Sequence, residues 1–210
     1  MAATVQDLTR WVQLFGEAVA QHQGELTDLD RAIGDADHGS NLARGMQAVL
    51  SKLAETPPAT VAELGKSVGM TLVGTVGGAS GPLYGTFFLR FGTGAGAVDA
   101  LEPAGLADAL GAGVDGVIQR GKAEPADKTM VDALAPAVQE LAAAVAAGTA
   151  LPQALQAAAS AAEAGRDATE ALVARKGRAS YLGERSAGHI DPGAASSALL
   201  IRALATALAD

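Results

Sequence analysis

Apolar side chains recur every three or four residues along most of the chain, which is the spacing that places them on one face of an α-helix. No stretch shows the alternation of apolar and polar residues that is typical of a strand. The pattern predicts eight helical segments, which cover or begin near residues 5–22, 40–54, 60, 82, 103, 129, 152–174 and 192.

Local signals mark the ends of several of these helices. Thr4 with Asp7, and Thr60 with Glu63, have the spacing of side chains that bond to the first turn of a helix. Pro136 falls inside the sixth segment. Because proline lacks the N–H that continues a helix, it should kink this segment or force an early turn.

Composition supports an all-α fold. Hydrophobic residues make up 49% of the 210 residues but aromatic residues only 3%, so the core must consist mainly of Ala, Leu and Val. Ala and Leu are strong helix formers. The length fits one domain, and we expect residues 1–210 to form a single unit without an internal linker.

Charge and residue usage exclude several classes of function. The formal net charge of −8 leaves no basic footprint for DNA or RNA, so we expect no nucleic-acid partner. The chain has no Cys, which excludes disulfides, Cys-ligated zinc and thiol catalysis. It shows neither a secretory signal nor an apolar run of about 20 residues, so we expect a cytoplasmic protein without a membrane segment.

Four connections are rich in Gly, Asp, Ser or Arg, and each lies beside the start of a predicted helix. They cover residues 33–39, 74–82, 121–129 and 175–193. Polar loops gathered at one end of an apolar scaffold are where functional sites usually lie. The sequence therefore directs the search for chemistry to these four loops.

Three carboxylates, those of Asp30, Asp35 and Asp37, lie within eight residues of one another. Clustered carboxylates repel unless a cation lies among them, and hard divalent cations prefer such oxygen ligands. An EF-hand is excluded, because its loop would place Met46 or Asn41 where a bidentate Glu is required. Alternatively, these acids are helix caps and solvated loop residues.

The other loops contain groups that suit a phosphate and a flat ring. Residues 74–85 are Gly-rich and end at a helix N-terminus, whose free N–H groups and dipole favour anions. Arg178 lies among other basic residues, and a guanidinium binds phosphate through two hydrogen bonds. Met130 could line a base such as adenine. Each feature also has a structural explanation: His38 and Met130 could be packing residues, and the basic loop could simply offset the acidic one.

Four longer motifs together resemble those of a known family. They read GDADHGSNLARG, GGASGPLYGTFF, GKAEPADKTM and GRASYLGERSAGHIDPGA. In content and order they strongly resemble the L subunit of bacterial dihydroxyacetone kinases over nearly the whole chain. The fit is closest to the phosphotransferase-system-dependent type, in which the L subunit is a separate chain of this size. The resemblance implies a barrel of eight antiparallel amphipathic helices with the nucleotide at one end.

The same resemblance implies the residues of the site. Asp30, Asp35 and Asp37 would bind two Mg²⁺ ions that bridge the phosphates of ADP or ATP. No side chain of this chain is expected to act as a catalytic group itself. The expected nucleotide-binding residues are His38, Gly39, Ser40, Asn41, Ala79, Ser80, Gly121, Met130, Arg178, Asp191, Pro192 and Gly193.

Partners follow from the resemblance as well. Enzymes of this family keep ADP bound as a cofactor, and a phosphohistidine on an M subunit rephosphorylates it in place. The phosphoryl group then passes to dihydroxyacetone on a K subunit, giving dihydroxyacetone phosphate. The resemblance thus implies a phosphotransferase subunit with K and M partners, and leaves a homodimer open. The alternatives are a nucleotide-binding regulatory module that docks on a transcription factor, and a purely structural helical protein.

Overall fold

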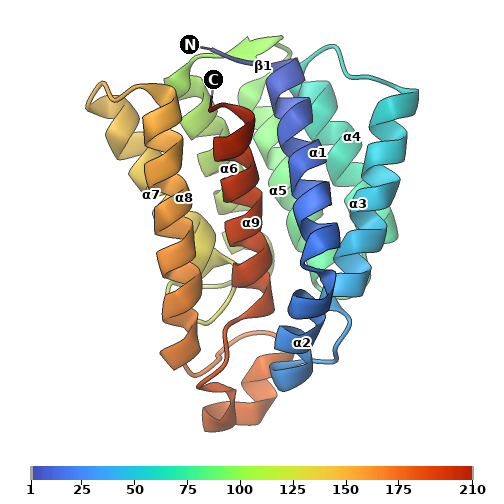
Figure 1. The fold of residues 1–210 in the computed structure, drawn as a ribbon, viewed down its shortest axis with the longest axis vertical. Coiled ribbons are helices and arrows are strands. Elements are labelled where there is room, and N and C mark those ends of the chain that lie inside the picture. The colour runs from blue at the N-terminus through green and yellow to red at the C-terminus, as the bar shows by residue number, and fades with distance from the viewer. Residues whose placement is uncertain (1, 210) are drawn as a thin grey trace.

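The computed structural model describes residues 2–209, and helices dominate this part of the chain (Figure 1). Its α-helices are α1 (Val5–Gln21), α2 (Gln23–Ile33), α3 (His38–Glu55), α4 (Val61–Thr75), α5 (Ser80–Ala95), α6 (Pro103–Gly121), α7 (Val131–Ala146), α8 (Leu151–Ala168) and α9 (Pro192–Ala207). Two 3₁₀ segments, η1 (Thr169–Ala171) and η2 (Arg178–Ser186), lie between α8 and α9. The strands β1 (Ala3–Thr4) and β2 (Ala100–Leu101), which the sequence did not predict, form one short antiparallel pair.

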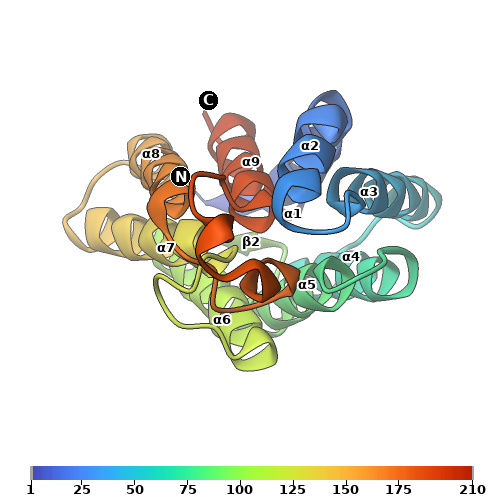
Figure 2. The same ribbon diagram turned by 90° about the horizontal axis from the view of Figure 1, so that it is seen from below.

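Eight of these helices form a closed ring. From α3 to α9 each helix packs on the next, α9 packs on α1, and α1 packs on α3. Figure 2, which views the molecule from one end, shows the helices arranged around a common interior. Neighbouring helices run in opposite directions, as the ribbon colours in Figure 1 show. The structure confirms the expected all-α barrel of antiparallel helices.

The ninth helix, α2, was not predicted, because residues 23–33 lie outside the expected segments. α2 follows α1 almost directly and lies at the end of the ring that faces the viewer in Figure 2. It buries few side chains, namely Leu26, Asp30 and Ile33. Such a short apolar stripe gives little periodic signal. α2 also approaches α3 closely, since a Cβ at Gly39 would lie 2.2 Å from the carbonyl oxygen of Gln23.

The helix starts agree well with the local signals. Thr4 and Asp7 form a complete capping box ahead of α1, and the Thr60 side chain accepts a hydrogen bond from the Glu63 N–H at the start of α4. The seventh predicted segment ends earlier than expected, because α8 stops at Ala168 and a short 3₁₀ turn replaces its last residues. Helix starts were therefore better predicted than helix ends.

Of the two outcomes predicted for Pro136, a kink or an early turn, the structure excludes the early turn. It lies inside α7, which continues from Val131 to Ala146. A proline at this position leaves the carbonyl of Asp132 without its helical donor. Gly165 of α8 packs against that carbonyl, and a Cβ there would lie 2.1 Å from the oxygen. α8 thus fits closely beside the part of α7 that proline leaves unpaired.

Aromatic side chains gather in one part of a core that is otherwise aliphatic. Trp11 of α1 lies 5.4 Å from Phe91 and 5.5 Å from Phe88 between ring centroids. Its indole N–H donates to the carbonyl of Leu200 at 2.9 Å, which satisfies the one polar atom of the cluster. Elsewhere small residues let helices approach closely.

None of the helices within residues 2–209 is both long and apolar enough to cross a bilayer.

The closest approach of α4 and α5 generates a stability prediction. A Cβ at Gly65 would lie 2.6 Å from the Gly92 Cα and from the Phe88 carbonyl oxygen, so Gly65→Ala must push two backbones apart. We expect this variant to lower the free energy of unfolding by about 1–3 kcal/mol, as measured by chemical denaturation.

Gly111→Ala is the matched control inside α6. A Cβ there meets nothing closer than 3.9 Å, so the better helix propensity of Ala should raise the free energy of unfolding by about 0.5–1 kcal/mol. Equal stability of the two variants would contradict the packing described here.

Candidate functional site

All four polar loops meet at one end of the barrel, around a pocket of about 370 Å³. Because the helices alternate in direction, every second connection lies at the same end, and this end faces the viewer in Figure 2. The two termini lie at the opposite end (Figure 1). The pocket has the size of a small-molecule site and is formed by residues that lie far apart in the sequence.

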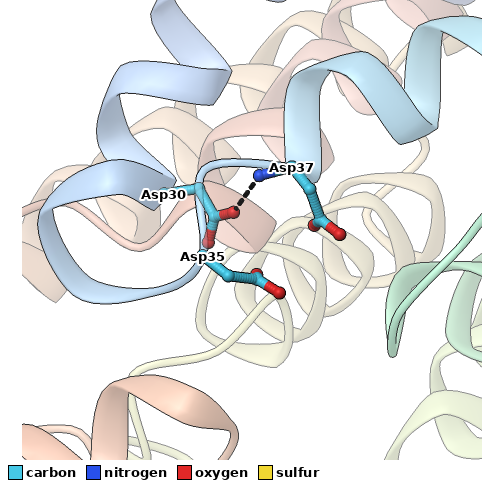
Figure 3. Close-up of side chains that lie close together, drawn as sticks. All are labelled: Asp30, Asp35 and Asp37. Carbon is cyan, nitrogen blue, oxygen red and sulfur yellow. Dashed lines mark hydrogen bonds between the residues drawn. The ribbon is translucent and has the colours of Figure 1, made fainter.

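The carboxylates of Asp30, Asp35 and Asp37 converge at one side of this pocket (Figure 3). Each offers an oxygen that lies within 4.8 Å of the others. Asp30, at the end of α2, is the most buried, with 8% of its surface exposed. Its Oδ2 atom accepts hydrogen bonds from the N–H groups of Asp37 at 2.9 Å and His38 at 3.1 Å.

Two small residues allow the acidic loop to take this shape. A Cβ at Gly34 would lie 2.0 Å from Oδ1 of Asp30, so a larger residue would displace the buried carboxylate. Ala36 has a left-handed backbone, with φ of 63°, between Asp35 and Asp37. Such a conformation costs of the order of 1–2 kcal/mol for a residue other than glycine, and strain of this kind concentrates at functional sites.

Only one of the three acids caps the helix that follows them. Asp37 precedes α3, but its side chain makes no capping hydrogen bond, and Asp30 satisfies the first N–H groups of α3 instead. The carboxylate of Asp37 and Oδ1 of Asp30 are therefore available for another partner, and Asp35 is engaged only in an exposed ion pair with Arg178. An all-oxygen set of converging carboxylates suits a hard divalent cation such as Mg²⁺ or Ca²⁺.

The N-terminus of α5 differs from the other barrel helices that begin at this end. Carboxylates lie at the starts of the others, with Asp30 bonded to α3, Asp132 in the first turn of α7 and Asp191 bonded to α9. α5 has neither an acidic residue in its first turn nor a side-chain cap. Its first N–H groups and its dipole thus favour an anion in the pocket. Gly77, Gly78, Ala79 and Ser80 line the pocket at this point.

His38 connects the acidic loop to the glycine-rich loop. Its Nδ1 lies 2.9 Å from Oγ of Ser80, and its Nε2 lies 2.9 Å from Oγ of Ser196. The Tyr84 hydroxyl, 2.7 Å from Ser196 Oγ, extends this buried chain of hydrogen bonds. Burial lowers the pKa of His38, partly offset by the charges of Asp30 and Asp37. A largely neutral His38 therefore fixes the position of Ser80 rather than adding positive charge.

Arg178 brings a cation to the acidic cluster from the far end of the chain. Its Nη2 lies 3.0 Å from Oδ2 of Asp35. Lys176 and Arg120 also line the pocket, while the remaining basic residues of the 175–193 loop do not. Because Arg178 is 68% exposed at its side chain, this ion pair adds little to stability. Its significance lies in the charge that it places at the mouth of the pocket.

Much of the remaining wall of the pocket is apolar, although Arg120, Lys128 and Thr129 also line it. Gly121 and the buried Met130 line it together with Leu83, Val117 and Ala123. Asp191, Pro192 and Gly193 complete the lining at the start of α9. A flat aromatic ring would pack against these apolar side chains, with the polar groups of the pocket on its other side.

Three expected site residues do not line the pocket. Gly39 packs against α2, and Ser40 lies at a shallow groove between α1 and α3. Asn41 is buried behind the glycine-rich loop, where its Oδ1 accepts a hydrogen bond from Arg44. A Cβ at Gly77 would lie 3.1 Å from Nδ2 of Asn41, so this side chain supports the loop from behind.

Sequence patterns missed several groups of the site. Lys128 and Tyr84 line the pocket, and Ser196 contacts His38, but none of them was singled out. Tyr84 and Ser196 lie inside helices whose apolar faces dominate the pattern. Lys128 lies in the GKAEPADKTM motif, directly after Asp127. A lysine next to an acid gives no signal in the sequence that it is buried.

Comparisons with known proteins agree with the geometry. The DAK2 domain family matches residues 32–206. The ADP-binding subunit DhaL of the PEP-dependent dihydroxyacetone kinase from Escherichia coli is 45% identical over 207 residues, which is 99% of each chain. The ADP-binding subunit DhaL of PEP-dependent dihydroxyacetone kinase 1 from Listeria innocua is 44% identical, over 93% of this chain and 92% of that one. The dihydroxyacetone kinase of C. freundii, solved with AMP-PNP and Mg²⁺, matches 93% of this chain and 33% of its own length, with a TM-score of 0.73 and 32% identity.

Asp191 generates a prediction about pH. Burial raises the pKa of this carboxyl to about 7, although the Ala194 N–H and the Lys128 ammonium oppose the shift. The folded protein thus holds this proton more tightly than the unfolded chain, where the pKa is about 3.9. The stability that Asp191 contributes is complete at low pH and is lost as the pH rises through about 7. Asp191→Asn keeps an acceptor oxygen but cannot ionise, so its Tm should rise relative to the parent between about pH 4 and about pH 7. A difference in Tm that does not change with pH would contradict this.

Proposed function

The chain belongs to the DAK2 domain family and, within it, to the DhaL subunits of phosphotransferase-system-dependent dihydroxyacetone kinases; from this premise, we propose that it holds ADP through Mg²⁺ in the pocket described above. The observation that carries the proposal is the position of three converging carboxylates beside the uncapped N-terminus of α5. A cation site next to an anion site is what a Mg²⁺-bound diphosphate requires.

Each wall of the pocket has a role in this proposal. Asp30, Asp35 and Asp37 would hold two Mg²⁺ ions between themselves and the phosphates. Ala79 and Ser80 would donate to phosphate oxygens from the start of α5, and Arg178 would bind phosphate at the mouth. Gly121 and Met130 would border the adenosine on the apolar wall, opposite His38. Asp191, Pro192 and Gly193 would close the pocket at the start of α9.

Gly39, Ser40 and Asn41 would act from behind the pocket. Gly39 allows α2, which carries Asp30, to pack on α3. Asn41 supports Gly77 and thereby the glycine-rich loop. Changes at these positions should affect the ligand through the loops that they support.

The arrangement suits phosphoryl transfer by positioning and charge. In such reactions negative charge spreads over the phosphoryl oxygens, and cations and N–H groups stabilise it without a protein nucleophile. Bound Mg²⁺ would supply most of the positive charge. The residues of this chain would fix the nucleotide, exclude water at the apolar wall and keep the terminal phosphate at the open end.

Partner subunits would supply the rest of the reaction. We propose that a phosphohistidine on an M subunit donates its phosphoryl group to ADP held here. The same group would then pass to dihydroxyacetone on a K subunit, giving dihydroxyacetone phosphate. Both exchanges require access to the phosphate end of the site, which agrees with the charged mouth formed by Asp35 and Arg178.

Asp35→Ala is expected to remove Mg²⁺-dependent ADP binding while leaving the fold intact. Asp35 is a partly exposed loop residue whose ion pair with Arg178 contributes little to stability. Affinity for ADP at saturating Mg²⁺, measured by calorimetry, should fall by at least about 10-fold, because even residues that only support a metal ligand cost 10–100-fold.

Asp28→Ala is the matched control for this experiment. Asp28 is an exposed acid of α2 that pairs with Arg31 and does not line the pocket. It should leave affinity unchanged. Equal affinity of the Asp35→Ala variant and the parent would overturn the assignment of the metal site.

Reconstitution tests the reaction itself. The chain, mixed with K and M subunits of a related kinase, ADP, Mg²⁺ and the phosphodonor system, should support formation of dihydroxyacetone phosphate, and omission of the chain should abolish it. A chain that serves only as a regulatory module would bind Mg²⁺ and ADP in the same way but would not restore product formation.

A further inference from the structure

Lys128 is the most deeply buried cation of the described residues, with 1% of its surface exposed. Burying an ammonium group is costly unless its N–H donors find acceptors. Here Nζ donates to the carbonyl of Thr169 at 2.6 Å, to that of Leu172 at 3.1 Å, and to that of His189. A fourth carbonyl, that of Glu170, lies 3.5 Å from Nζ, so all three donors of the ammonium group have acceptors.

These carbonyls lie at the two ends of one loop. Thr169 and Leu172 lie where α8 and η1 end, and helix ends carry unpaired carbonyls that attract a cation. His189 lies just before α9. The residues in between, 172–189, form a compact loop, which we call the Arg178 loop because it carries that side chain to Asp35. Its closure is reinforced by a hydrogen bond from Gly188 N–H to the Glu170 carbonyl at 2.7 Å.

The loop that carries Lys128 is built to hold it in place. Ala126 and Lys128 both have left-handed backbones, with φ of 66° and 63°. The carboxylate of Asp132 accepts from the N–H groups of Ala126 at 2.6 Å and Thr129 at 2.8 Å, which stabilises this strained conformation. Strain that is maintained in this way usually serves a function. A second connection runs from Arg175 N–H to the Asp127 carbonyl at 3.0 Å.

We propose that Lys128 is a positioning residue, which fastens the two ends of the Arg178 loop and thereby places the Arg178 guanidinium beside Asp35 at the phosphate end of the pocket. This inference rests on the proposed function in one respect, namely that Arg178 binds phosphate. Lys128 lines the pocket, but the N–H donors of its ammonium group are used on these carbonyls, so it contributes to nucleotide binding through Arg178 and not through a hydrogen bond to the ligand. The effect of changing Lys128 on nucleotide affinity should therefore depend on the presence of Arg178. A residue that contacted phosphate directly would have the same effect with or without Arg178.

The first test measures order in the loop without any nucleotide. Lys128→Met keeps the length of the side chain but removes all three donors. In hydrogen–deuterium exchange of the full chain, peptides within 172–189 should exchange at least about 10-fold faster in this variant, while α1 and α4 remain unchanged. Lys122→Met is the matched control, because Lys122 lies in the same loop with a left-handed backbone (φ of 50°) but is exposed. Unchanged protection of 172–189 in Lys128→Met would overturn the proposal.

The second test is a double-mutant cycle on Mg²⁺-dependent ADP affinity. Lys128→Met and Arg178→Ala should each weaken binding by about 10-fold, and the double variant should be weaker than either single variant by less than about 3-fold. Losses that multiply would show that Lys128 acts independently of Arg178 and would overturn the proposal. A parent protein that bound no ADP would refute the proposed function, and the exchange experiment would still decide whether Lys128 fastens the loop.

Ser186→Ala keeps the proposal testable if Lys128→Met does not fold. The buried Ser186 hydroxyl accepts from Ala174 N–H at 2.8 Å and donates to the Gly183 carbonyl at 2.6 Å, so it orders the same loop from within. This variant should also accelerate exchange in 172–189 and should lose affinity only when Arg178 is present. An equal loss of affinity in the Arg178→Ala background would contradict a role for loop order in placing Arg178.

Discussion

The loops at one end of the barrel hold three carboxylates together, with oxygens within 4.8 Å of one another, so these groups repel one another. At such separations like charges in a partly buried site oppose one another strongly, and a cation among them reverses the sign of the interaction. The protein supports this arrangement through α2, which carries Asp30, and through the N–H groups at the start of α3, which hold one of its oxygens. Gly34 and the left-handed Ala36 then bring the other two acids into place.

The charges around the pocket indicate where the anionic end and the ring of a ligand would lie. Within residues 2–209, four barrel helices begin at this end. Carboxylates lie at the N-termini of α3, α7 and α9, whereas the N-terminus of α5 has none. An anion would therefore find its best place between the start of α5 and the cations that we propose for the acidic cluster. His38 bridges these two regions by hydrogen bonds to Ser80 and Ser196. The apolar wall near Met130 leaves the opposite side of the pocket suited to a ring.

Sequence reasoning succeeded where the signal is local. The Thr4–Asp7 capping box and the acidic cluster are each contained within a few residues, and the alternation of helix direction brings the four polar loops to one end. α2 was missed because it buries too few side chains to show a period. Pro136 lies inside α7 without ending it, and the Asp132 carbonyl, which lacks its helical donor, lies against Gly165 of α8. The contacts of His38 with Ser196 and of Lys128 with His189 join residues that are 158 and 61 positions apart. Only the closed ring of helices brings such pairs together.

The proposed function depends on divalent cations among Asp30, Asp35 and Asp37. A crystal structure of the chain grown with ADP and Mn²⁺, with anomalous scattering recorded for manganese, tests it most directly. We expect anomalous peaks at coordination distance, about 2.0–2.2 Å, from oxygens of all three carboxylates, with the diphosphate between the metal and the start of α5. Manganese bound elsewhere, with the three side chains turned to solvent beside bound ADP, would contradict it.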